Sequence, residues 1–117
     1  MIQFLLLGAN LSLHNMLLQP FVEIGNNVIL WSGNHIGHHS SIADNVFVAS
    51  HVVISGQVRI GAGTFIGVNV TIGDHISVGE DCVVGAGALV LKDAGPGTVF
   101  RGTASVRQDS SEACKRG

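Results

Sequence analysis

The chain has 117 residues and a net charge of -2, with 46% hydrophobic and only 12% charged residues. The negative charge, together with the lack of a basic stripe interleaved with aromatic residues, argues against nucleic acid or a membrane surface as a partner. A domain of this length buries only about two-thirds of the surface that its unfolded chain exposes. The apolar composition therefore predicts that part of the surface is covered by other subunits, which favours an oligomer over a monomer.

The first segment, residues 1–17, precedes the periodic part of the chain. It contains no Lys or Arg, and its longest uninterrupted aliphatic and aromatic run is Phe4-Leu5-Leu6-Leu7. It therefore predicts neither a secretory signal nor a membrane span. We expect this segment to form a cap or extension at the open end of the following repeats. The two widely separated cysteines, Cys82 and Cys114, fit a reducing cytoplasm.

From residue 18 onward an aliphatic residue recurs at every sixth position. The series is Leu18, Ile24, Leu30, Ile36, Ile42, Val48, Ile54, Ile60, Ile66, Ile72, Val78, Val84 and Val90. Four residues after each member except the last comes a second series, which is small or β-branched except at Asn34: Val22, Val28, Asn34, Ser40, Val46, Val52, Val58, Thr64, Val70, Ile76, Cys82 and Ala88. A period of six suits a coil with three flat sides, each made by one hexapeptide.

Eighteen residues then complete one coil, so residues 18–95 predict a solenoid of about four coils, followed by a C-terminal loop and tail over 96–117. Both series should point inward. The corners between the sides should favour left-handed backbone angles, which explains the glycine and asparagine found there. Asn34 and Ser40 interrupt the apolar interior next to His38, and we expect them either to brace that corner or to bond to the backbone.

Residues eighteen apart should stack about 4.8 Å from one another, so the outward faces form columns. Two columns are largely apolar: the first is Ile29, Phe47, Phe65 and Val83, and the second is His35, Val53, Thr71 and Leu89. The third column is polar and consists of Glu23, Ser41, Arg59 and Ser77. Exposed apolar columns predict packing against other copies of the chain. Cover by the chain's own tail is the alternative.

The tandem [LIV]-[GAED]-x-x-[STAV]-x pattern resembles the hexapeptide acyltransferase superfamily. Residues 30–40 (LWSGNHIGHHS) and 50–56 (SHVVISG) are similar to bacterial sugar acyltransferases that modify sialic acid or nucleotide-linked amino sugars. The resemblance implies an all-β, left-handed parallel β-helix that forms a homotrimer. It also implies acyl transfer from an acyl-CoA to a hydroxyl or amine of a sugar or nucleotide sugar, with acetyl-CoA as the expected co-substrate. These relatives usually carry an N-terminal sugar-binding domain, which residues 1–17 do not provide, so the acceptor stays open.

The same resemblance implies the site residues. Of six histidines, His38 matches the general base of the bacillosamine-type N-acetyltransferases, a role that suits a side chain whose ordinary pKa lies near neutrality. Gly56, one coil further on, matches a backbone oxyanion donor. The positions carried over for binding acetyl-CoA are Phe47, Gly56, Val68, Ser77 and Ala86. Phe47 replaces a histidine of those enzymes, and His51 is a possible substitute for it, while residues 97–103 resemble the loop near the adenosine.

Two other functions compete with this one. The γ-class carbonic anhydrases share such a coil and bind zinc with histidines, which draws attention to His35, His38 and His39. However, His35 is predicted on a flat face and the other two are corner neighbours, so we expect no metal. The third alternative is a non-catalytic remnant or assembly module, because a fold alone does not establish an activity.

Overall fold

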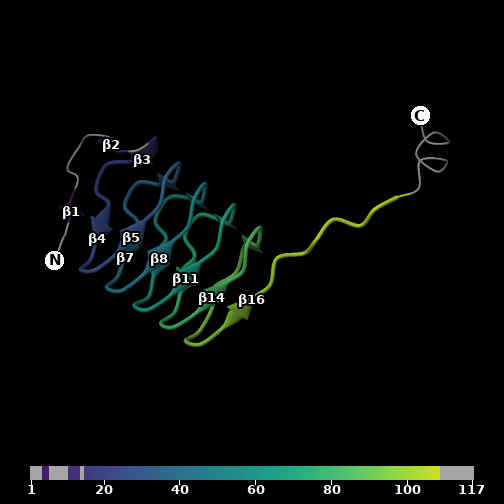
Figure 1. Cartoon of the computed structure of the whole chain (residues 1–117). Helices are drawn as coiled ribbons and strands as arrows, with labels where there is room; N and C mark the ends of the chain where they lie inside the picture. The colour runs from purple at the N-terminus through teal and green to yellow at the C-terminus, as the bar shows by residue number, and fades with distance from the viewer. Residues whose placement is uncertain (1–3, 6–10, 14, 109–117) are drawn as a thin grey trace.

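The computed structural model describes residues 4–5, 11–13 and 15–108 of the chain. The residues up to β16 (Val99–Phe100) wind into a three-sided, all-β solenoid of the left-handed parallel β-helix type, and the chain after β16 runs away from it (Figure 1). The described part contains no helix. The predicted fold class is thereby confirmed. None of the described residues lies in a helix long and apolar enough to cross a membrane.

Each flat side of the solenoid is one sheet of short strands. Sheet A consists of β1 (Phe4–Leu5), β4 (Glu23–Ile24), β7 (Ser41–Ile42), β10 (Arg59–Ile60) and β13 (Ser77–Val78). Sheet B consists of β2 (Leu11–Leu13), β3 (Met16–Leu18), β6 (His35–Ile36), β9 (Val53–Ile54), β12 (Thr71–Ile72) and β15 (Leu89–Val90). Sheet C consists of β5 (Ile29–Leu30), β8 (Phe47–Val48), β11 (Phe65–Ile66), β14 (Val83–Val84) and β16 (Val99–Phe100).

Strands on successive coils pair in parallel with the predicted offset of eighteen residues. Ile42, for example, lies opposite Ile60, which in turn lies opposite Val78. The inward series is buried along nearly its whole length, and Ile36, Ile54, Ile66 and Ile72 have no exposed surface at all. Because each buried Ile contributes about 1.5 to 3 kcal/mol, this stack is the main source of the stability of the fold.

The corners repeat with the same period as the strands. A positive φ angle occurs at every sixth residue from 15 to 87: Asn15, Phe21, Asn27, Gly33, His39, Asn45, His51, Gln57, Gly63, Asn69, His75, Asp81 and Gly87. Asparagine and glycine adopt this left-handed region at lower cost than other residues do, as the sequence predicts. Phe21, with φ of 63°, is the residue least suited to such a position.

The solenoid makes about five turns, one more than the sequence predicts. The extra turn comes from residues after Val90: Ala94 forms a bridge with Val78, and β16 pairs with β14 so that Val99 lies opposite Val83. Both offsets are sixteen residues rather than eighteen. Pro96 occupies the position due for the next aliphatic residue, where it lacks an N–H for the ladder. The corner between Val90 and Ala94 is therefore two residues shorter than the earlier ones. Phe100, in the following strand, packs against the core.

The first coil is flanked by antiparallel strands. In sheet A, β1 pairs with β4, and in sheet B, β2 pairs with β3. These pairings satisfy strand edges that would otherwise offer free N–H and C=O groups at this end of the solenoid. The cap expected over 1–17 and the tail expected over 96–117 are described only in part, because residues 1–3, 6–10, 14 and 109–117 lie outside the described residues, among them His14 and Cys114.

Candidate active site

His38 and His39 form a close pair on the corner that leads from sheet B to sheet A. They directly follow β6 and Gly37, and both side chains are exposed. Their Nδ1 atoms are 3.1 Å apart, and the two rings stand at 87° to each other. At that distance one ring nitrogen donates a hydrogen bond to the other, and the tautomers of the two rings decide which one is the donor.

Gly56 lies one coil below His38 on the same corner. A Cβ atom at Gly56 would come within 2.7 Å of Nε2 of His38, so the imidazole occupies the space that a side chain would need. The Gly56 N–H donates to Oδ1 of Asp74 at 2.8 Å. An acyl oxyanion can reach this N–H only when the Asp74 carboxylate turns away. The predicted donor thus lies beside the predicted base but has a partner of its own.

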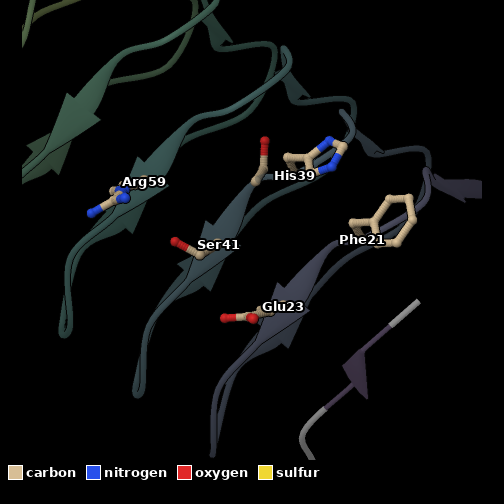
Figure 2. A pocket seen from close by; sticks show the side chains of 6 residues that line it. Phe21, Glu23, His39, Ser41 and Arg59 are labelled. Atoms are coloured by element: carbon tan, nitrogen blue, oxygen red, sulfur yellow. The ribbon is translucent and has the colours of Figure 1, made fainter. Parts of the chain in front are cut away.

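Two adjacent cavities follow the outward face of sheet A next to this corner. The larger, of about 550 Å³, is lined by Phe21, Glu23, His39, Ser40, Ser41 and Arg59. The smaller, of about 400 Å³, is lined by His39, Gln57, Arg59, His75 and Ser77. Figure 2 shows Glu23, Ser41 and Arg59 on three successive strands, with His39 and Phe21 beside them at the corner. Because they share His39 and Arg59, we call the two cavities together the sheet A groove.

The structure divides the predicted CoA residues into two groups. Phe47 in β8, with Val68 and Ala86 on the corner between sheets C and B, forms the first group. The second group consists of Gly56, on the corner between sheets B and A, and Ser77, in β13. The face of sheet B separates them within one chain. In the first group Phe47 stacks on Phe65, with ring centroids 5.2 Å apart.

The polar residues inside the solenoid bond to the backbone of neighbouring segments. The side chain of Asn34 donates to the Trp31 carbonyl at 2.8 Å and accepts from the Val52 N–H at 2.9 Å. The Ser40 hydroxyl donates to the Ser55 carbonyl at 2.9 Å and accepts from the Val58 N–H at 3.1 Å.

Of the two predicted roles, backbone bonding is therefore the one these contacts support. Thr64, which the sequence did not single out, bonds in the same way to the Gly79 carbonyl and the Cys82 N–H. The signal for all three is a polar residue at the inward position four after the aliphatic one.

The three histidines considered for a zinc site, His35, His38 and His39, do not point to one common metal position. Among the residues that the structure describes, no three His, Cys, Asp or Glu side chains are grouped so that they could hold a metal ion. His35 lies in β6 on the face of sheet B, whereas His38 and His39 lie on the corner after it. Elemental analysis of the purified protein tests this alternative directly.

The hexapeptide period and the three-sided coil define a left-handed β-helix of hexapeptide repeats. A protein-family model described as bacterial transferase hexapeptide (six repeats) matches residues 21–56 and 57–92, which is more than half of the chain. The chain therefore belongs to the bacterial hexapeptide transferase family, and the predicted membership of the hexapeptide acyltransferase superfamily is confirmed. A sequence comparison with curated proteins found no match.

Two acetyltransferases are among the solved structures that share this fold. A serine acetyltransferase in complex with cysteine superposes with a TM-score of 0.67, at 24% identity over 77% of this chain and 40% of that one. Perosamine N-acetyltransferase from Caulobacter crescentus, solved with CoA and GDP-perosamine, superposes with a TM-score of 0.58, at 21% identity over 91% of this chain and 59% of that one. The chain thus spans 40% and 59% of the length of these relatives. At such identities the likeness establishes the fold.

Proposed function

We propose that the protein is an acyl-CoA-dependent acyltransferase that acylates a hydroxyl or amine of a small acceptor, a sugar or amino sugar in the first instance. The observation that carries this proposal is the placement of the His38–His39 pair, in a hexapeptide transferase solenoid, above Gly56 and beside the sheet A groove. Acetyl-CoA is the simplest donor, and the dependence on an acyl-CoA suits a cytoplasmic enzyme. The CoA and GDP-perosamine bound by the Caulobacter relative are consistent with this chemistry.

In this proposal His38 is the general base. The proposal requires the tautomer of His38 that carries its proton on Nδ1 and donates it to Nδ1 of His39, because this tautomer leaves the Nε2 lone pair of His38 free above Gly56. Nε2 accepts the proton of the acceptor hydroxyl or amine as that atom attacks the thioester carbon. The Gly56 N–H, released from Asp74, stabilises the oxyanion. When the tetrahedral intermediate collapses, the carbon–sulfur bond breaks and the departing thiolate takes the proton from His38.

We propose further that the protein assembles as a homotrimer. Outward apolar side chains on sheets B and C are well exposed in the single chain, with Ile29, Phe65, Val83 and Leu89 between 43% and 62% exposed. Packing of these faces around a threefold axis would cover them. It would also bring the Phe47, Val68 and Ala86 group of one subunit towards the Gly56 and Ser77 group of the next. One CoA molecule could then contact both.

Replacing Phe65 by glutamate is expected to dissociate the trimer, because it places a charge in the middle of the apolar column of sheet C, between Phe47 and Val83. Ser41→Glu adds the same charge to sheet A and serves as the matched control, which should remain trimeric. Light scattering coupled to size-exclusion chromatography gives the mass. A monomeric wild type would contradict the trimer, and a trimeric Phe65→Glu variant would contradict the choice of this face.

Acetyl-CoA is expected to raise the melting temperature of the wild-type protein. At a hundred times its dissociation constant it should add about 2.7 kcal/mol to the free energy of unfolding. ATP at the same concentration controls for binding of any nucleotide phosphate. Release of free thiol in the presence of amino sugars and nucleotide sugars then tests turnover. A protein that shows neither a thermal shift nor thiol release would instead be the non-catalytic remnant or assembly module.

A further inference from the structure

We infer that the sheet A groove binds the acceptor and selects one that carries an anionic group, a carboxylate or a phosphoryl group, held by Arg59. This inference rests on the proposed function and adds the class of acceptor. The volume of each of its two cavities lies within the range of about 300 to 1,000 Å³ that is typical of small-molecule sites. Its two parts, of about 550 and 400 Å³, join at His39 and Arg59, so a ligand that spans them passes over both residues.

Arg59 is isolated among the basic residues of the chain. The other five Lys and Arg residues lie beyond Val90, so the repeats before that point contain a single permanent positive charge. That charge lies at the centre of the groove, paired in register with Ser41 on one side and Ser77 on the other. Neither serine can neutralise a guanidinium. A planar guanidinium surrounded by small hydroxyl side chains presents the bidentate donor geometry that carboxylates and phosphates require.

Phe21 forms the apolar wall of the groove. Its φ angle of 63° lies in the left-handed region, which a bulky residue adopts only with strain, and 41% of the side chain is exposed. The later members of the same corner column are His39, Gln57 and His75, all polar. The Phe21 ring stacks on the imidazole of His39, with centroids 4.8 Å apart and planes 18° from parallel. Such a flat surface suits the apolar face of a sugar ring or the body of another small acceptor.

The groove also determines which end of the acceptor meets the base. His39 lines both cavities and lies 3.1 Å from His38 through the Nδ1 atoms, so the reacting hydroxyl or amine belongs at this corner. Glu23 lies two strands from Arg59, about 9 to 10 Å along the sheet. Its carboxylate repels a second anion and accepts hydrogen bonds from hydroxyls or an ammonium group. The acceptor is therefore anionic at one end, and polar but not anionic at the other.

Three amino sugars with a common ring test this inference: glucosamine, which has no anion, glucosamine 6-phosphate and muramic acid, which carries a carboxylate. With the wild-type enzyme, kcat/KM from thiol release should be roughly 10- to 100-fold higher for an anionic member than for glucosamine, the range expected of charge-assisted hydrogen bonds. Whichever of the two is preferred identifies the anion as phosphoryl or carboxylate. Arg59→Gln should abolish the preference by raising KM with little change in kcat. Arg107→Gln, the same change in the exposed tail, should retain it.

Calorimetric titration with the same three compounds provides a measurement that does not depend on turnover. The wild type should bind an anionic member and Arg59→Gln should not. Equal binding of glucosamine and the anionic sugars, binding that survives Arg59→Gln, or no binding of any of the three at millimolar concentration would overturn the inference. Binding that depends on Arg59 without thiol release would support the groove as an anion site and count against the proposed acyl transfer.

Discussion

His38→Ala is expected to lower kcat by about 10² to 10⁴-fold, the usual contribution of a positioned general base. The melting temperature and the affinity for CoA should change little. The His38 side chain is exposed on a corner and takes no part in the buried stack, and substitutions at such positions usually cost within about 0.5 kcal/mol. Thiol release with the best acceptor found for the wild type measures the rate.

The other corner histidines are the matched controls for this variant. His39→Ala should mainly raise KM for the acceptor, because His39 lines the sheet A groove, and should lower kcat less than His38→Ala does. His75→Ala should have a small effect on both constants. Near-wild-type turnover of His38→Ala, or loss of activity in His51→Ala instead, would show that the base has been assigned to the wrong residue.

Ile60→Asp is expected to unfold most of the protein under conditions in which the wild type is stable. Ile60 is 2% exposed and lies between Ile42 and Val78 in the inward column of sheet A. A carboxylate there has no water and no partner, which costs several kcal/mol even when the group becomes protonated. Total stabilities of about 5 to 15 kcal/mol leave little reserve against such a loss. Ile54→Asp, in the inward column of sheet B, should behave in the same way.

Ser77→Asp is the control for this experiment, because Ser77 pairs with Arg59 on the outward side of the same sheet. Its melting temperature should stay close to that of the wild type. Thermal unfolding followed by circular dichroism compares the three variants. Soluble Ile60→Asp and Ile54→Asp proteins with normal melting temperatures would mean that the inward and outward faces of the solenoid are interchanged.

The hexapeptide period predicted some of the positions in the candidate site but not the contacts between them. Counting by eighteen correctly put His38 above Gly56 and His39 in a column with Gln57 and His75, because residues on successive coils must stack. It could not show that the Gly56 N–H bonds to Asp74, or that His39 rather than His38 lines the groove. The roles of His38 and Gly56, and of Phe47, Val68, Ser77 and Ala86 in CoA binding, stay predictions.

The sequence by itself determined the strands, their inward residues and the left-handed corners. Each of these depends on a local preference that recurs every six residues: an aliphatic side chain that must leave water, and a residue that tolerates a positive φ angle. The tertiary structure alone decided how the coil ends and where the groove lies. Ala94 and Phe100 join the solenoid because their partners sixteen residues earlier offer free strand edges. The groove exists because Phe21 and His39 stack across one coil and Arg59 extends from the next. Such contacts depend on the rotamers of side chains that are distant in sequence, and these rotamers cannot be predicted from a hexapeptide period.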